Sequence, residues 1–329
     1  MTDILERGER IKEEAAFLTD LIDEVEKVVV GQRRLVERLI IALLADGHVL
    51  LEGVPGLAKT MLVRTLAQAL DLNFHRIQFT PDLLPSDVTG TEIYNPASGE
   101  FSVRRGPVFS NILLADEINR APAKVQSALL EAMQEHQVTI GETTFDLPSP
   151  FFVMATQNPL EQQGTYPLPE AQLDRFLLKV LVDYPSKEDE QRIVEAMARP
   201  SPRTEVRTVT SAEQLKRAMA LQSEVYIDEL VTAYIVDLVR ATRDPASVGL
   251  DDLAPLIETG ASPRASISLG LAGRAHAFLD GRAYVKGHDI KSVAHDVLRH
   301  RILLSYEAEA REIPVEEVIT RVLDQIHVP

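Results

Sequence analysis

Residues 48–60 read HVLLEGVPGLAKT, and this stretch decides the fold. It opens with an apolar run at residues 49–51, which is typical of a buried parallel strand. A loop with two glycines follows, and Lys59 and Thr60 then begin a helical stretch, MLVRTLAQAL. This order of strand, glycine-rich loop, Lys-Thr and helix is the P-loop motif, in which backbone N–H groups and the helix N-terminus bind phosphate.

The P-loop motif assigns a function to several side chains. We expect the ammonium group of Lys59 to reach the β and γ phosphates of a nucleotide, and the hydroxyl of Thr60 to bind Mg²⁺. Ala58 occupies the second glycine position of the usual pattern, G-x-x-x-x-G-K-[ST], although alanine disfavours a positive φ. An ordinary strand–loop–helix turn is the alternative. The predicted nucleotide-binding residues of the loop are Gly53, Val54, Pro55, Gly56, Leu57, Ala58, Lys59, Thr60 and Met61.

Length and composition exclude several classes of protein. A chain of 329 residues is too long for one typical domain, which predicts two. The net charge of −16 argues against a nucleic-acid-binding face, and the absence of cysteine excludes disulfides and thiolate metal sites. No run approaches the roughly 20 apolar residues of a membrane helix, and the N-terminus is too charged for a signal peptide. We therefore expect a cytoplasmic location without membrane insertion.

A second apolar run, in the sequence NILLADE at residues 111–117, ends in two carboxylates. A buried strand here would place Asp116 and Glu117 at the edge of the sheet where α/β proteins bind ligands. We expect Asp116 to bind Mg²⁺ through water, and Glu117 to orient and activate the attacking water. Acidic residues that face solvent at a strand end are the alternative.

Two more polar side chains are candidates for the same reaction. Asn158 follows a third apolar run at residues 151–156, and its amide is predicted to hydrogen-bond the attacking water or the γ-phosphate. An ordinary turn before Pro159 is the alternative. Arg175 is a candidate arginine finger, a cation that stabilises the transition state on a neighbouring subunit's nucleotide. Its alternative is a local salt bridge.

The pattern predicts two β-hairpins inside the nucleotide-binding part, at residues 93–103 and 137–147. Their aromatic side chains are candidates for gripping a substrate in a ring pore, with cross-strand packing as the alternative. These side chains are Tyr94, Phe101 and Phe145.

The flanking regions are predicted to be helical. Residues 4–29 have apolar side chains at helical spacing, and Gly31 and Gln32, which follow, are predicted to border an adenine pocket, with a helix–helix turn as the alternative. A boundary near residues 199–207 divides the chain into a predicted nucleotide-binding domain at 1–200 and a helical domain at 208–329. Within the latter, Ser262 and Pro263 begin a helix and project Arg264. Arg264 either reaches the phosphates or is solvated.

Over nearly its whole length the chain resembles the AAA+ ATPases, and among them the MoxR family. The motifs that establish the resemblance are GVPGLAKT at 53–60, RIQFTPDLLPSDVTG at 76–90, ADEINRAPAKVQSALLEAM at 115–133, ATQNP at 155–159, YPLPEAQLDRF at 166–176 and GASPRA at 260–265.

The resemblance implies an α/β fold with a parallel sheet, β-hairpin inserts and a small all-α lid domain that follows. It also implies a homo-oligomeric ring, usually a hexamer, that uses ATP and Mg²⁺. Carried over residue by residue, Lys59 and Thr60 belong to Walker A and Asp116 and Glu117 to Walker B. The remaining assignments are Asn158 as sensor 1, Arg175 as the arginine finger, Arg264 as sensor 2 and Arg120 as a second interface arginine.

The function implied by the resemblance is Mg²⁺-dependent ATP hydrolysis by a chaperone-like remodeller. Such proteins are thought to work with von Willebrand factor A domain proteins on client proteins, in maturation or in the insertion of metals and cofactors. Two alternatives stay open, a nucleotide-gated regulatory binding module and a chelatase-type motor subunit. A DNA-directed ring conflicts with the acidic composition.

Overall fold

The computed structural model describes residues 2–329 except 55, 98, 160–163 and 199–204. The chain forms two compact units. The sheet unit comprises residues 19–176 and 180–216, and the helical unit comprises the residues up to 18, residues 177–179 and residues 217–329. The division into domains at 1–200 and 208–329 stays a prediction. Helices α1 (Thr2–Glu26) and α8 (Ala212–Gln222) contribute residues to both units.

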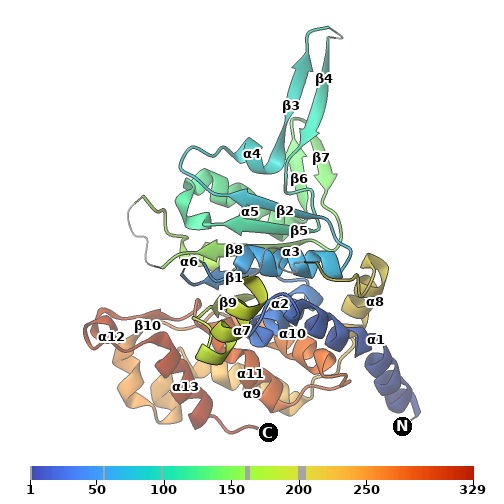
Figure 1. The fold of residues 1–329 in the computed structure, drawn as a ribbon. Helices are drawn as coiled ribbons and strands as arrows, with labels where there is room; N and C mark the ends of the chain where they lie inside the picture. The colour runs from blue at the N-terminus through green and yellow to red at the C-terminus, as the bar shows by residue number, and fades with distance from the viewer. Residues whose placement is uncertain (1, 55, 98, 160–163, 199–204) are drawn as a thin grey trace. The chain divides into compact units, whose positions relative to one another are not determined.

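A five-stranded sheet organises the sheet unit, with the strand order β2-β5-β8-β1-β9 (Figure 1). The pairs β2–β5, β5–β8 and β1–β8 are parallel, as the buried apolar runs of the sequence predict. The strands are β1 (Val49–Glu52), β2 (Phe74–Gln78), β5 (Ile112–Asp116), β8 (Phe152–Gln157) and β9 (Leu178–Leu181). Because the strands are parallel, β1, β2, β5 and β8 bring their carboxyl ends to one edge of the sheet.

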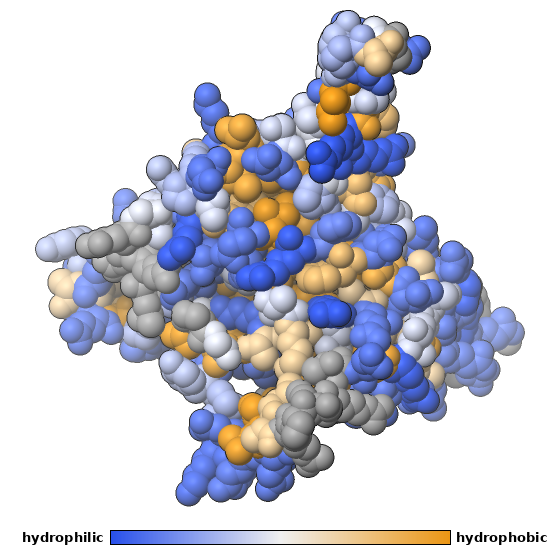
Figure 2. Space-filling model, turned by 45° about the horizontal axis from the view of Figure 1, so that its top comes forward, coloured by the Kyte–Doolittle hydropathy of each residue, from blue (hydrophilic) through white to orange (hydrophobic). Residues whose placement is uncertain are grey.

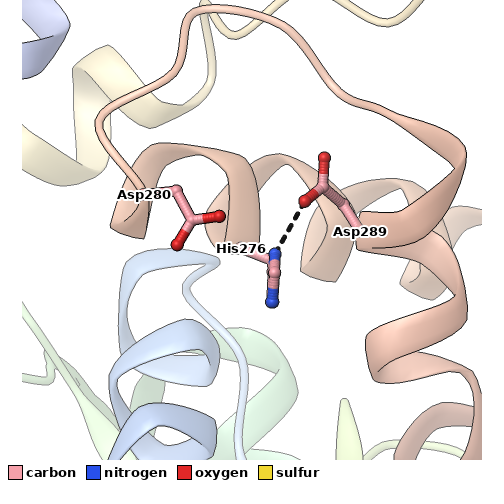
Figure 3. A group of neighbouring side chains, drawn as sticks. All are labelled: His276, Asp280 and Asp289. Atoms are coloured by element: carbon pink, nitrogen blue, oxygen red, sulfur yellow. Dashed lines mark hydrogen bonds and ion pairs between the residues drawn. The ribbon is translucent and has the colours of Figure 1, made fainter.

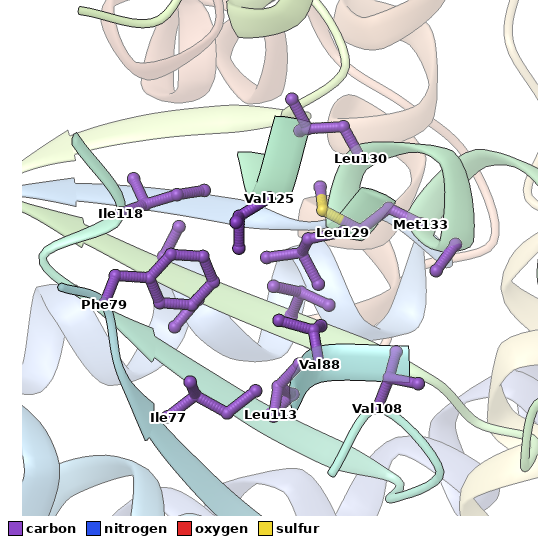
Figure 4. Close-up of a cluster of buried hydrophobic side chains, with 14 of the residues drawn as sticks. Ile77, Phe79, Val88, Val108, Leu113, Ile118, Val125, Leu129, Leu130 and Met133 are labelled. Atoms are coloured by element: carbon purple, nitrogen blue, oxygen red, sulfur yellow. The ribbon is translucent and has the colours of Figure 1, made fainter. Parts of the chain in front are cut away.

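Helices and the connections between strands cover this sheet. The helices of the unit are α2 (Arg33–Leu44), α3 (Lys59–Ala69), α4 (Pro85–Thr89), α5 (Ala123–Glu135), α6 (Glu170–Leu173) and α7 (Lys187–Met197), with the 3₁₀ helix η1 (Ile118–Arg120). Along α5, Val125, Leu129 and Met133 recur every four residues and are all buried. They meet Phe79 and Leu113 beside the strands, as Figure 4 shows. Each such side chain stabilises the fold by about 1.5–3 kcal/mol.

Two antiparallel hairpins interrupt the sheet unit, as predicted; the first extends beyond the expected residues 93–103, and the second agrees with the expected residues 137–147 to within one residue. They are formed by β3 (Gly90–Asn95) with β4 (Glu100–Arg105), and by β6 (Gln137–Ile140) with β7 (Thr143–Asp146). The β3–β4 hairpin projects from the sheet unit (Figure 1), and hydrophobic atoms lie among hydrophilic ones along its stem (Figure 2). Tyr94 and Phe101 pair at its exposed end, with ring centroids 5.1 Å apart.

Phe145 belongs to a different environment from this exposed pair. Its ring lies edge-on to that of Phe109, and the guanidinium of Arg105 lies about 5 Å from both ring centroids. Phe145 also packs against the buried core of the sheet unit. Tyr94 and Phe101 lie directly opposite each other in the β3–β4 register, so they show the cross-strand packing of the alternative although both side chains are exposed. Phe145 instead packs against the core.

The helical unit follows the predicted pattern with one addition. Its elements include α9 (Glu229–Ala241), α10 (Pro263–Leu279), α11 (Gly287–Leu298), α12 (Tyr306–Ala310), α13 (Val315–Gln325), the 3₁₀ helices η2 (Pro245–Val248) and η3 (Asp251–Leu256), and the strands β10 (Ile257–Thr259) and β11 (Leu303–Leu304). The sequence did not predict the small antiparallel β10–β11 pair. Among the described helices, none is long and apolar enough to cross a bilayer.

A buried carboxylate ties α10 to the start of α11. Asp289 accepts a hydrogen bond from Nδ1 of His276 at 2.8 Å (Figure 3). It also accepts hydrogen bonds from Arg282 and from the backbone N–H of Lys286. Burial alone would raise the pKa of Asp289, but these hydrogen bonds outweigh it and hold the pKa well below its usual value. His276, Asp280 and Asp289 together have the side-chain types of a metal site. However, Asp289 already forms an ion pair with Arg282, which neutralises its charge.

Candidate functional site

The P-loop borders a cavity of about 550 Å³ at the carboxyl edge of the sheet. Strand β1 ends at Glu52, the loop crosses the edge of the sheet, and α3 begins at Lys59 with its N-terminus beside the cavity. Pro55 lies outside the described residues. The cavity is lined by Gly53, Val54, Gly56, Leu57, Ala58, Lys59, Thr60, Met61, Arg76, Gln78, Asp116, Glu117, Thr156, Gln157 and Asn158.

Ala58 adopts the left-handed conformation that the second glycine of the motif would favour. Its φ and ψ are 55° and 21°, and it is the N-cap residue of α3. Alanine adopts this conformation at a cost of about 1–2 kcal/mol relative to the right-handed one. The chain therefore keeps the P-loop turn without the usual glycine.

Lys59 turns back onto its own loop. Its Nζ lies 2.5 Å from the carbonyl oxygen of Gly53. Burial lowers the pKa of the Lys59 ammonium, while the nearby carboxylates of Asp116, Glu117 and Glu52 oppose this shift. An anionic ligand in the cavity would raise the pKa of Lys59, as these carboxylates do, and so would favour its charged form.

Thr156 contacts both acidic residues at the end of β5, Asp116 through its carboxylate and Glu117 through its backbone N–H. Its hydroxyl donates a hydrogen bond to Oδ1 of Asp116 at 2.6 Å and accepts one from the backbone N–H of Glu117 at 2.8 Å. Glu117 has a φ of 56°, which is strained for a residue with a side chain. Sequence reasoning missed Thr156, although it is the last but one residue of β8 and follows the Ala115–Ala155 pair in register.

Arg76 and Gln78 of β2 also reach these carboxylates, and sequence reasoning missed them as well. Arg76 lies 2.7 Å from Oδ2 of Asp116, and Nε2 of Gln78 donates to Oε2 of Glu117 at 2.7 Å. Nε of Arg120 lies 3.2 Å from the same oxygen of Glu117. The strand pattern of the sequence places residues 76 and 78 on one face, but it does not show that this strand pairs with β5.

The other predicted residues have different positions. Asn158 lines the cavity and is almost buried. Arg175 follows α6, is half-buried, and donates from Nη1 to the carbonyl of Leu130 on α5 at 2.8 Å. It is not among the described residues that line the cavity. Arg264 belongs to the helical unit, where Ser262 caps α10 as expected, with its hydroxyl accepting from the Arg264 N–H.

A second cavity, of about 300 Å³, adjoins the P-loop and is mainly apolar. Gln32 lines it and donates from Nε2 to the carbonyl of Leu57 at 3.2 Å, which joins the segment after α1 to the P-loop. Gly31 has a φ of 78°, and a Cβ there would approach Asp189 of α7 to within 2.5–2.8 Å. The lining includes Val28, Val29, Val30, Gln32, Gly56, Leu57, Ala58, Met61, Tyr184, Pro185, Glu190, Ile193, Ala196 and Met197.

The chemistry of these two cavities fits a purine nucleotide and a hard cation. The smaller cavity offers apolar walls for a flat base, and the larger one offers the α3 N-terminus and Lys59 for phosphates. The Asp116 carboxylate and the Thr60 hydroxyl, which both line the larger cavity, are oxygen donors of the kind that Mg²⁺ prefers. The sequence did not indicate that α7 forms one wall of the smaller cavity.

Comparisons with known proteins agree with this geometry. Residues 48–178 match the family described as "ATPase family associated with various cellular activities (AAA)", and residues 252–322 match the AAA lid domain. The chain is 50% identical to "Chaperone MoxR1" of Mycobacterium tuberculosis, over 98% of this chain and 85% of that protein. It is 36% identical to "Protein MoxR" of Paracoccus denitrificans, over 92% of this chain and 93% of the other.

A solved structure is also similar. The crystal structure of a protein from Cytophaga hutchinsonii aligns with a TM-score of 0.91 at 50% identity, and the alignment covers 100% of this chain and 98% of the other. The sequence relatives and the family match together establish the family and its ATPase activity. The chain belongs to the MoxR family of AAA ATPases.

Proposed function

We propose that this ATPase hydrolyses ATP with Mg²⁺ inside a homo-oligomeric ring, a hexamer, and acts as a chaperone-like remodeller. The observation that supports this most is the convergence of Lys59, Thr60, Asp116, Glu117 and Asn158 on one cavity. These residues come from three separate segments of the chain, and phosphoryl transfer needs mainly such positioning and charge neutralisation.

Each of these five residues has a role in the proposed reaction. Lys59 would exchange the Gly53 carbonyl for phosphate oxygens, and Asp116 and Thr60 would hold Mg²⁺. Mg²⁺, when bound, neutralises charge on the phosphates. Glu117 orients and deprotonates the attacking water, and Asn158 hydrogen-bonds that water or the γ-phosphate.

The proposal assigns a residue of the neighbouring subunit to the transition state. Arg175 is half-buried and does not belong to the described lining of its own cavity, which fits a residue that acts on the next subunit's nucleotide. Arg120, beside Glu117, is the second candidate. Arg264 contributes from the lid. An arginine finger accelerates the reaction by about 10³–10⁵-fold.

The proposed cellular role is the maturation of partner proteins, including insertion of metals or cofactors, together with a von Willebrand factor A domain protein and a client. The name of the Mycobacterium tuberculosis relative, "Chaperone MoxR1", supports a remodelling role. The exposed aromatic pair Tyr94 and Phe101 gives the β3–β4 hairpin a surface for gripping a client. The expected cytoplasmic location stays a prediction.

The test of hydrolysis is the Glu117→Gln variant. We expect it to bind ATP with wild-type affinity while turnover falls by at least about 100-fold, because the amide cannot accept a proton from water. Glu131→Gln, on the exposed side of α5, is the matched control and should keep wild-type turnover. Equal turnover of wild type and Glu117→Gln would contradict the assigned role.

A regulatory alternative has one observation in its favour. Arg76, Gln78 and Arg120 all contact the carboxylates that hydrolysis needs. A nucleotide-gated binding module with slow hydrolysis would benefit from this arrangement. Steady-state turnover that stays slow in the assembled ring, with and without a partner, would favour the binding module.

A further inference from the structure

Arg76 connects the two carboxylates of the proposed hydrolysis site through a hydrogen-bond network. Its Nη2 and Nε lie 2.7 and 3.1 Å from Oδ2 of Asp116, and Nη2 also donates to Oε1 of Gln78 at 2.8 Å. Gln78 in turn donates to Glu117 at 2.7 Å. One guanidinium thus contacts Asp116 directly and Glu117 through a single amide.

Both oxygens of Asp116 are engaged in this arrangement. Thr156 donates to Oδ1, and Arg76 donates to Oδ2. The Asp116 side chain is only 17% exposed, so solvent screens its charge interactions weakly. Because arginine keeps its charge at every physiological pH, a change of pH in that range does not remove this cation from beside the carboxylate.

We propose that Arg76 is a positioning residue that holds the Asp116 carboxylate and competes with Mg²⁺ for it. The inference rests on the proposed function, in which Asp116 and Thr60 hold Mg²⁺. A divalent cation at this carboxylate and the Arg76 guanidinium repel each other, so Arg76 releases Asp116 when Mg²⁺ and nucleotide bind.

The position of Arg76 allows that release. Strand β2 is at the edge of the sheet, and the Arg76 side chain is 46% exposed. The side chain can therefore turn towards solvent without disturbing the core on the opposite face, where Ile77 is buried. Release of Arg76 also frees Gln78, and through it Glu117, from the network.

The experiment measures metal dependence of binding rather than turnover. A fluorescent ATP analogue is titrated into wild type, Arg76→Ala and Arg76→Lys at a series of Mg²⁺ concentrations and in EDTA. We expect the Mg²⁺ concentration for half-maximal binding to fall about fivefold in Arg76→Ala, the size expected of a half-exposed ion pair. Arg76→Lys, which keeps the charge without the planar fork, should lie between the two.

A second readout and a control make the result specific. Mn²⁺ binding followed by electron paramagnetic resonance should tighten by a similar factor in Arg76→Ala. Arg104→Ala, which removes an equal charge from the exposed β4 strand, should behave as wild type in both measurements.

Three results would overturn the competition. An unchanged or higher Mg²⁺ requirement in Arg76→Ala excludes it, and so does an equal shift in Arg104→Ala. Loss of nucleotide affinity in EDTA as well as in Mg²⁺ would make Arg76 a phosphate contact instead. Failure of wild type to bind the nucleotide at any Mg²⁺ concentration would reject the proposed function itself.

Discussion

Ala58 and Glu117 face the same cavity with backbone conformations that side chains disfavour. Their φ values are 55° and 56°; Ala58 directly precedes α3, and Glu117 directly follows β5. Strained residues of this kind persist only where the surrounding structure holds them, and they concentrate at functional sites. At Ala58 the strain directs the N-terminus of α3 to the cavity. At Glu117 it turns the carboxylate beside Gln78 and Arg120.

The conformation of Ala58 leads to a prediction about substitutions there. Ala58→Gly should bind nucleotide within about twofold of wild type, because glycine adopts a positive φ without cost. Ala58→Val should lose at least about tenfold in affinity, since a β-branched residue is a severe outlier at this φ. Equilibrium nucleotide binding measures both. Similar affinities for the glycine and valine variants would show that this backbone conformation is not required for binding.

Part of the P-loop cavity could be identified from residue types in the sequence. The rest depends on the register between neighbouring strands of the sheet. Lys59, Thr60, Asp116 and Asn158 stand beside apolar strands in recognisable motifs, and all four line the cavity. Arg76, Gln78 and Thr156 contact the carboxylates only because β2, β5 and β8 are neighbours in one register. A single sequence does not reveal that register, so these contacts were not predicted.

At the scale of elements, His48 joins helix α5 to strand β8. Its Nδ1 accepts from the backbone N–H of Val153 at 3.1 Å, so Nε2 bears the hydrogen and donates to the carbonyl of Met133 at 3.1 Å. The ring is buried and lies edge-on to that of Phe151. Burial lowers the pKa of His48 to about 4, so the neutral imidazole is part of the folded state.

This neutral histidine predicts a pH dependence of stability. Because the pKa of His48 falls from 6.5 unfolded to about 4 folded, the unfolded chain binds more protons between these values, and stability decreases as the pH falls from 6.5 to 4. The free energy of unfolding from urea titrations should therefore drop by about 2 kcal/mol more in wild type than in His48→Gln between pH 7 and 5.

The control for this comparison is His75→Gln, an exposed position on β2, which should keep the wild-type dependence on pH. If His48→Gln lost stability with acid as steeply as wild type, the buried imidazole would not be responsible. The contributions of the other titrating groups to the pH dependence cancel in these comparisons, because each variant differs from wild type at a single histidine.

Helices and strands were predictable from the sequence where a helical apolar pattern extended over many residues or where a strand consisted almost wholly of apolar residues. The parallel strands, the two hairpins and the long first helix agree with the sequence pattern. Within the helical domain expected at residues 208–329, α11 ends at Leu298, and residues 303 and 304 pair with β10 instead of forming helix. That pairing joins segments about 45 residues apart, and a local pattern does not report it.

At the scale of the whole molecule, one chain alone holds only part of the proposed catalytic site. The cavity of the sheet unit brings together groups for phosphate, cation and water, while Arg175 bonds to Leu130 outside the described lining. A single subunit therefore has a binding site without its proposed arginine finger. Assembly into a ring is the step that completes the site in our proposal, so activity should depend on contact between subunits.

Mixing two inactive variants tests this claim most directly. Glu117→Gln subunits keep Arg175 but lack the proposed base, and Arg175→Ala subunits keep the base but lack the finger. Each alone should be nearly inactive, and an equimolar mixture should recover about a quarter of wild-type turnover, since random assembly makes one interface in four intact. A mixture no more active than the average of its two components would contradict hydrolysis shared between subunits.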